Sequence, residues 1–298
     1  RNAAKESDMN FRGSLLKLIV LLSLTMPAGM LAGCSSGSGN SNTESLRIYE
    51  WYVDKGSFTA VDDDTTAAVF QLTLENDVSI APSDEILYFT NRGAQEGGND
   101  TVDNVMNNIW PRVYGSVAPN AIIKATTANQ EAILLFCILD KPVYNKATGQ
   151  ISFTITYLDG QRPVSNLAVT DVKMIITNNA AQMQTQVWSH LLEGDVGTFE
   201  PTATDGTYTF RIQQTIGNAA FGYVCAPHRQ SSTITVKEYI QSWQDRFGTI
   251  PPNAAIAYDA TNDQVGGVQI VTLSNPVYDE TTGSISFTAK LLYSAFLP

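Results

Sequence analysis

The feature that most constrains the fold of this chain is an internal repeat with an offset of 133 to 134 residues. Residues 142–154 return as residues 276–288, and nine of the 13 positions are identical. Upstream, the triplet Pro-Asn-Ala occurs at 119–121 and again at 252–254. Matches that keep the same order over so long a stretch indicate a tandem duplication, not a short-period solenoid. The chain is therefore expected to contain two copies of one module.

Strands account for most of each expected module. Apolar residues alternate with polar ones at 70–74 and at 208–212, which predicts half-buried strands. The continuous apolar run 133–139 predicts a strand buried on both faces. The polar segment 145–150, in which Gly149 is free to take a positive φ, predicts the turn of a hairpin.

One amphipathic helix is expected in each module. In the second copy, Thr235 and Glu238 form a capping box, and the apolar face that follows extends to Phe247. In the first copy the corresponding face covers residues 102–113, and Pro111 is expected to end or kink that helix early.

These elements predict an α+β fold that is rich in β-structure. We expect two tandem modules, 46–180 and 181–298, each a mainly antiparallel sheet or sandwich with one amphipathic helix packed on it. A chain of 298 residues is long enough to bury a sizeable core in this way.

The first 33 residues have the pattern of a bacterial secretory signal, with Met9 as the expected start. Basic residues precede the apolar run 18–24, and the segment ends at Leu31-Ala32-Gly33-Cys34. This ending resembles the bacterial lipobox, in which the cysteine thiol accepts diacylglycerol and becomes the new N-terminus. The alternative is a short membrane anchor, but the 14 residues 18–31 are fewer than the roughly 20 that a spanning helix needs.

Residues 34–45 are rich in serine, glycine and asparagine and are expected to form a flexible tether behind the lipid anchor at Cys34. Ser35 stands where many bacteria with two membranes place an aspartate that retains lipoproteins in the inner membrane. The expected location is therefore the cell envelope, lipid-anchored in the outer membrane, on its periplasmic or surface face.

Composition excludes several classes of function. The net charge of −11 and a pI near 4.6 argue against nucleic acid as a partner, because that binding depends on neutralising phosphates. Only two histidines are present, so His-rich metal sites are not expected, and we predict no metal and no cofactor. Cys137 and Cys225 are candidates for a disulfide in an oxidising envelope, and the alternative is two separate buried thiols.

Several motifs resemble those of a family of secreted bacterial proteins with no established activity. Members carry approximately Tyr/Phe-Ser-Asp-Arg-Pro-x-Arg, a helix ending in Trp, then Pro-Pro-Asn-Ala, then strands joined at Asn-Pro-x-Tyr. Here residues 223–229 keep only the proline and last arginine of the first motif, whereas residues 89–95 keep its first arginine and replace Asp by Asn. Trp243 and residues 251–254 match the later motifs. The resemblance implies the module boundaries and an envelope setting, but no substrate.

The candidate binding residues lie in these motifs. Arg92 and Arg229 are candidates for contacting an anion or carboxylate, and the alternative is a structural ion pair or hydrogen bonds to loop carbonyls. Asn120 and Asn253 are expected to make turns, because Asn side chains bond nearby backbone groups. The remaining candidates are the motif neighbours Asn91 and His228.

No nucleophile motif or pair of catalytic carboxylates stands out in the sequence. We therefore predict a membrane-tethered envelope lipoprotein that acts without catalysis, as a binding or scaffold protein with an envelope protein or glycan as its partner. The alternatives are an enzyme that degrades envelope polysaccharide or peptide, and a solute-binding lipoprotein.

Overall fold

A computed structural model describes the backbone of residues 18–23 and residues 47–61, 68–75, 85–90, 95–164, 166–177, 188–194, 196–213, 219–258 and 267–296. The lipidation candidate Cys34, the tether and the candidates Asn91 and Arg92 lie outside these residues. Within them the chain is rich in strands that pair antiparallel, as the sequence predicts.

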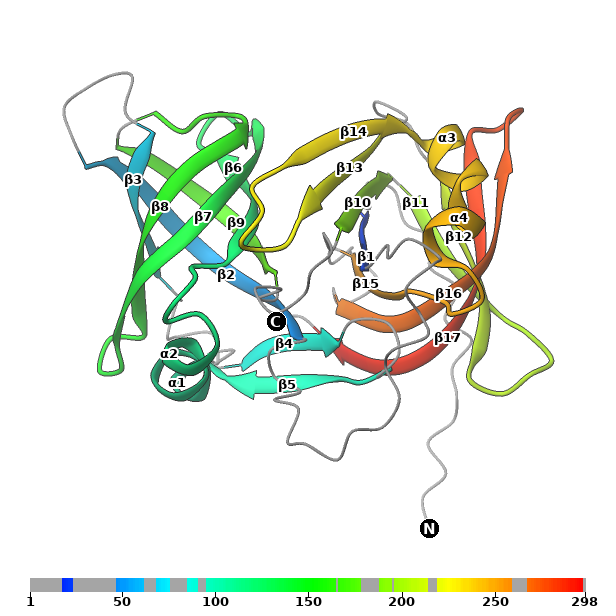
Figure 1. The fold of residues 1–298 in the computed structure, drawn as a ribbon, viewed down its shortest axis with the longest axis horizontal. Helices are drawn as coiled ribbons and strands as arrows, with labels where there is room; N and C mark the ends of the chain where they lie inside the picture. The colour runs from blue at the N-terminus through cyan, green and yellow to red at the C-terminus, as the bar shows by residue number, and fades with distance from the viewer. Residues whose placement is uncertain are drawn as a thin grey trace, which may run out of the picture.

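Eight strands form one sheet, in the order β3-β8-β7-β6-β9-β2-β4-β5. The long strand β2 pairs with β4 through its first residues and with β3 through its last, so β2, β3, β8, β7, β6 and β9 close into a six-stranded barrel (Figure 1, left). The strands of this sheet are β2 (Arg47–Ala60), β3 (Val69–Glu75), β4 (Glu85–Thr90), β5 (Gly97–Thr101), β6 (Asn120–Thr127), β7 (Ala132–Asn145), β8 (Gln150–Gly160) and β9 (Leu167–Ile176).

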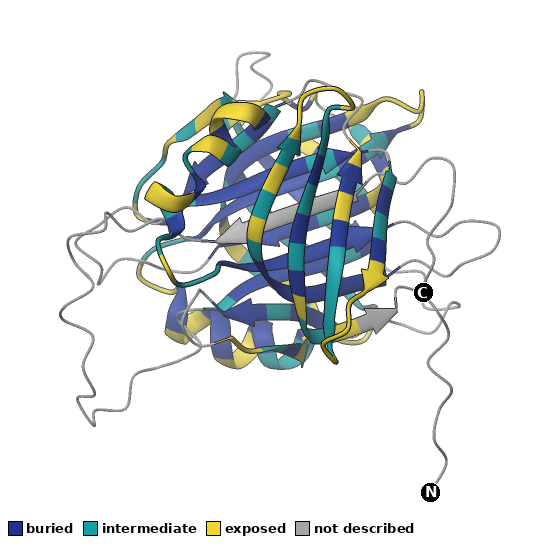
Figure 2. Cartoon of the chain, turned by 90° about the vertical axis from the view of Figure 1, so that its right-hand side faces the viewer, coloured by how far each residue is buried: buried dark blue, intermediate teal, exposed yellow. Residues whose placement is uncertain are grey.

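Nine strands form the second sheet, in the order β11-β12-β17-β16-β15-β1-β10-β13-β14. Its outer strands alternate buried and exposed positions along their length (Figure 2). Its strands are β1 (Leu18–Ser23), β10 (Trp188–Gly194), β11 (Val196–Pro201), β12 (Thr207–Gln213), β13 (Ala219–Val224), β14 (Ser231–Thr235), β15 (Asn253–Tyr258), β16 (Gly267–Asp279) and β17 (Ser284–Phe296).

Helical segments follow β5 and β14. The first consists of α1 (Val102–Asn104), a π-helical turn η3 (Val105–Ile109) and α2 (Trp110–Val113). Pro111 does not end this segment early: it lies in the first turn of α2, and the helical residues continue to Val113. The distortion instead takes the form of the π-helical turn just before it.

The second helical segment consists of α3 (Val236–Gln241) and α4 (Trp243–Phe247). The predicted capping box is confirmed: Glu238 donates its backbone N–H to the Thr235 hydroxyl at 3.2 Å, and its carboxylate accepts from the Thr235 N–H at 3.1 Å. Two of the first orphan N–H groups of the helix are satisfied in this way.

The buried side chains fall into three clusters. One fills the barrel beneath the first helical segment, and a second lies between the nine-stranded sheet and α3–α4. The third, which we call the contact core, joins the two sheets face to face. It consists of Ile48, Leu87, Phe89, Ile122, Phe136 and Ile175 from the first sheet and Leu191, Tyr223, Ala255, Ala257, Val268 and Ile270 from the second.

Local predictions from the sequence agree with these elements. Residues 70–74 and 208–212 lie in β3 and β12, and 133–139 lies in β7. The segment 145–150 connects β7 to β8, and Gly149 has a φ of 69°. Alternation and turn chemistry therefore identify these strands correctly.

Candidate functional site

The candidate residues that the structure describes gather where the two sheets meet, and Asn120 lies at the centre of the group. Asn120 begins β6 and is fully buried. Its side-chain amide donates to the carbonyl of Val224 at 2.5 Å and to the carbonyl of His228 at 2.7 Å. Both acceptors belong to the other sheet or to the loop that leaves it. Asn120 therefore does not cap a local turn; it connects strands more than 100 residues apart in sequence.

Arg229 completes this arrangement. Its guanidinium donates to the side-chain oxygen of Asn120 and, at 2.9 Å, to the carbonyl of Ala118. Partial burial lowers the pKa of Arg229, because burial disfavours a charged guanidinium. The Ala118 contact is a hydrogen bond to a loop carbonyl, the alternative to an anion contact for this residue.

Asn253 makes the reciprocal contact. It begins β15 of the second sheet, is fully buried, and donates its amide to the carbonyl of Thr90 at 2.8 Å. Thr90 is the last residue of β4 in the first sheet. Each sheet therefore sends one Asn side chain to a strand end of the other sheet, and we call Asn120, Asn253 and Arg229 the Asn clamp.

Two hairpins bring the acceptors into position. The β13–β14 hairpin reaches toward the barrel at one end of the molecule, and the β4–β5 hairpin reaches toward the second sheet at the other (Figure 1). Their approach is close: the ring of Tyr223 in β13 lies 5.7 Å from that of Phe136 in β7. A Cβ built on Gly97 in β5 would lie 2.9 Å from Cγ2 of Ile270 in β16, so only glycine fits there.

A buried carboxyl group also lies at this contact. Glu50 of β2 is 2% exposed and accepts a hydrogen bond from the Tyr52 hydroxyl at 2.5 Å. Burial raises the pKa of Glu50 to about 7, against the opposing effects of the Tyr52 bond and the charge of Lys173. The sequence analysis missed this residue, although a single acidic side chain inside the aromatic run 49–52 was a visible signal.

One ion pair and one side-chain hydrogen bond also bridge the two sheets. Lys124 of β6 and Glu193 of β10 are 2.7 Å apart, and the lysine is the more buried partner. Ser231 of β14 donates its hydroxyl to the carboxylate of Asp159 in β8. The contact between the sheets therefore combines an apolar cluster with polar bonds, as interfaces between packed subunits do.

The two histidines have different surroundings. His190 in β10 is 2% exposed, lies 4.8 Å from the ring of Tyr239, and has its Nε2 3.3 Å from Arg246 Nη1. Burial, with a further contribution from the Arg246 charge, lowers the pKa of His190 to about 3, so the ring is neutral at pH 7. His228 is partly exposed and contributes its backbone carbonyl to the Asn clamp.

Cys137 and Cys225 are both fully buried and are not joined by a disulfide. Cys137 lies in the barrel core, whereas Cys225 directly follows β13. Burial raises the pKa of the Cys137 thiol well above its usual range, so the thiol is protonated and weakly reactive. Of the two alternatives for this pair, the structure contains the separate thiols.

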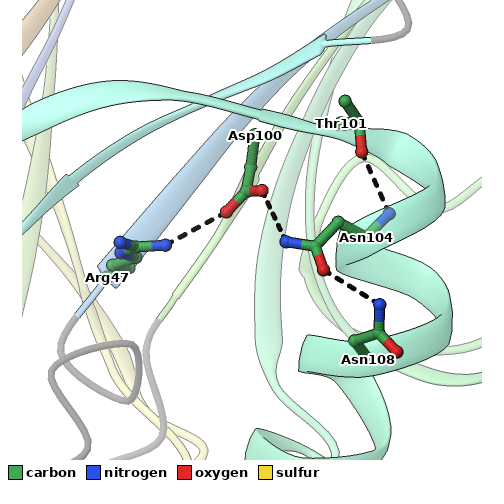
Figure 3. A network of polar contacts seen from close by, with 5 residues as sticks. All are labelled: Arg47, Asp100, Thr101, Asn104 and Asn108. Carbon is green, nitrogen blue, oxygen red and sulfur yellow. Dashed lines mark hydrogen bonds and ion pairs between the residues drawn. The ribbon is translucent and has the colours of Figure 1, made fainter.

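A second polar network lies at the start of the first helical segment (Figure 3). Arg47 at the start of β2 donates to the carboxylate of Asp100 at 3.0 Å, and Asp100 accepts from the Asn104 amide at 2.7 Å. Asn104 in turn accepts from Asn108, and the Thr101 hydroxyl accepts from the backbone N–H of Asn104. The network ties the helix to the strand on which it packs, which is a structural role.

Among the residues that the structure describes, no three His, Cys, Asp or Glu side chains are grouped so as to hold a metal ion. Within the same residues, none of the helices combines the length and apolar character that a membrane span requires. Comparison with known proteins gives no match: no family model, no curated protein and no solved structure is significantly similar to this chain.

Proposed function

We propose that this chain is an envelope lipoprotein, anchored at Cys34 and acting without catalysis as a binding or scaffold protein. The observation that carries the proposal is the sequence Leu31-Ala32-Gly33-Cys34, which follows an apolar run and precedes a polar tether. An acylated cysteine at this place holds the folded part of the chain about a dozen residues from the membrane. With three acyl chains the attachment is effectively stable.

We further propose that the folded part consists of two diverged copies of one β-rich module. The repeated sequence segments support this, and so does the strand order. One sheet runs β3-β8-β7-β6-β9-β2-β4-β5, and the other runs β12-β17-β16-β15-β1-β10-β13-β14 with β11 at its edge. The elements correspond one to one in chain order, helical segment included, except that β1 stands at the place of β9.

The Asn clamp supports a scaffold role for this pair. The two copies contribute the same motif residue, Asn120 or Asn253, and each uses it on a carbonyl of the other copy. These bonds and the contact core hold the two copies together. Its outward faces then present two related surfaces on a single tether, which raises the effective concentration of the second surface once the first is bound.

The anchoring is tested by intact-mass analysis of the protein purified from the membranes of an expressing bacterium. We expect a chain that begins at Cys34 and carries acyl groups, and we expect Cys34→Ala to abolish both the cleavage and the acylation. Cys137→Ala is the matched control and is expected to be processed normally, because its thiol is buried in the barrel. A chain that keeps residues upstream of Cys34 would overturn the lipoprotein proposal.

The scaffold role is tested by crosslinking in cells of the natural host, with an affinity tag after Pro298. We expect a near-stoichiometric protein partner in the membrane fraction. Loss of that partner in Cys34→Ala would mean that position on the membrane is required, whereas its retention would place recognition in the folded modules. A preparation without any enriched partner would contradict the scaffold role.

A further inference from the structure

Strand β1 occupies an unusual place for a segment expected to be removed. It lies inside the nine-stranded sheet between β10 and β15, antiparallel to both. Six of its residues are in register with β10 and four with β15. Its neighbours are deeply buried: every residue of β15 is buried, as are residues 189–192 of β10.

In the other sheet the same place belongs to β9. Ile175 of β9 is in register with Ile122 of β6 and with Glu50 of β2. In the second sheet Leu21 has the corresponding position, in register with Ala255 of β15 and with Leu191 of β10. The two strands therefore agree in order, direction and register.

The end of β9 indicates the chemistry that this place requires. Met174 and Ile176 point into the barrel core, while Ile175 belongs to the contact core between the sheets. The last three residues of β9 are thus apolar on both faces, whereas Lys173 before them is half-buried. Strand β15, beside the corresponding place in the second sheet, also faces a core on each side: Ile256 lies in the core beneath α3–α4, and Ala255 lies in the contact core.

We infer that, once residues 1–33 are removed, the gap between β10 and β15 is a strand-binding site. The inference rests on the proposed lipoprotein processing, which takes β1 away. An empty gap would expose two rows of unpaired backbone N–H and C=O groups and open two apolar cores to water. Filling it with a strand restores the main-chain hydrogen bonds, and the side-chain positions on its two faces give specificity.

The occupant is a strand of β9 type donated by a partner protein. It needs about six extended residues that run antiparallel to β10 and β15 and include a stretch that is apolar on both faces. The tether cannot serve, because residues 35–42 contain no apolar side chain. Each described strand from β2 to β17 is already paired within its sheet.

The test uses the processed protein with Ala255→Cys, in which Cys137→Ala and Cys225→Ala remove the buried thiols. The probe is a synthetic peptide with the sequence of residues 167–176 and cysteine at the position of Ile175. Residues directly opposite in neighbouring strands are close enough for a disulfide. The control peptide carries its cysteine at the position of Met174, which faces the other side of the strand.

We expect the first peptide to form the disulfide at least tenfold more efficiently than the control. Equal yields, or no disulfide with folded protein, would overturn the strand site while leaving the lipoprotein proposal intact. A processed protein that forms dimers by light scattering and refuses the peptide would overturn it as well, since a second copy then fills the gap.

Intact-mass analysis distinguishes failure of the lipoprotein proposal from failure of the strand site. If residues 1–33 are retained, β1 itself stays in the gap, and a Leu21→Cys, Ala255→Cys variant purified from membranes forms an internal disulfide. That result would overturn both proposals, whereas a mass beginning at Cys34 confines any failure to the strand site.

Discussion

Removal of the Asn120 side chain is the most direct test of how the two sheets are held together. The side chain makes two donor bonds, to the carbonyls of Val224 and His228, and accepts one from Arg229. Each neutral bond contributes about 1 kcal/mol to stability, and a bond to a charged group contributes about 1.5–3 kcal/mol. Asn120→Ala is therefore expected to lower the free energy of unfolding by about 3.5–5 kcal/mol, a change of several hundredfold to several thousandfold in the folding equilibrium.

A double-mutant cycle separates the Arg229 bond from the rest. The single variants Asn120→Ala and Arg229→Ala are compared with the double variant. Arg229 also donates to the Ala118 carbonyl, so its own substitution removes more than the shared bond. We expect a coupling energy of about 1.5 kcal/mol between the two side chains, because they are in direct contact and the bond is charge-assisted.

The measurement is urea unfolding followed by tryptophan fluorescence, since the chain has four tryptophans. The midpoint is expected to fall while the slope stays constant, which shows a loss of stability without a change in the surface exposed on unfolding. Asn107→Ala is the matched control: its amide bonds Asp103 on the exposed face of the first helical segment, and a change below about 0.5 kcal/mol is expected.

Two results would refute this reasoning. If Asn120→Ala unfolds within about 0.5 kcal/mol of the parent, the buried carbonyls it contacts have other donors and the clamp contributes nothing. If the cycle gives a coupling near zero, Arg229 and Asn120 are not bonded in solution.

Three further predictions concern single positions. Burial raises the pKa of Glu50 to about 7, so the folded protein keeps a proton that the unfolded chain releases near pH 4.5. The free energy of unfolding should therefore fall as the pH rises from about 4.5 to 7, by at most roughly 3 kcal/mol. Glu50→Gln should remove this dependence in denaturation measured across that range. Gly97→Ala should cost about 1–3 kcal/mol through its clash with Cγ2 of Ile270, and it should cost less in a chain that already carries Ile270→Ala, which removes that atom; an equal cost in both backgrounds, measured by urea unfolding, would argue against the contact. Thr235→Ala should cost about 1 kcal/mol in urea unfolding by removing the helix cap, and Thr235→Ser should be nearly neutral.

The elements that the sequence predicts well are those whose signals are local. Burial alternates with a period of two along residues 70–74, and this alternation follows from the pleat of a strand, whatever the strand pairs with. Gly149 and the capping box at Thr235 likewise depend only on the backbone within a few residues.

The contact between the sheets has no local signal. Asn120 and Asn253 have the composition of turn residues, and their partners lie 104 and 163 residues away in sequence. The same holds for Glu50: its neighbours suggest an ordinary strand, and its raised pKa results from complete burial, which the local sequence does not reveal. Which carbonyl a buried amide meets is decided by packing, and packing depends on both sheets at once.

The clamp gives the Pro-Asn-Ala triplets at 119–121 and 252–254 a role beyond their own strands. If each Asn bonded only within its own sheet, loss of one amide would leave the other sheet unaffected. Instead Asn120 holds the end of β13 and Asn253 holds the end of β4, so each sheet depends on an amide from the other. Arg229 bonds Asn120 and so supports only the first of these two contacts. Gln95, which stands 134 residues earlier in the sequence, is exposed. The two halves of the clamp are therefore unequal, and they tie a strand end of each sheet to a side chain of the other.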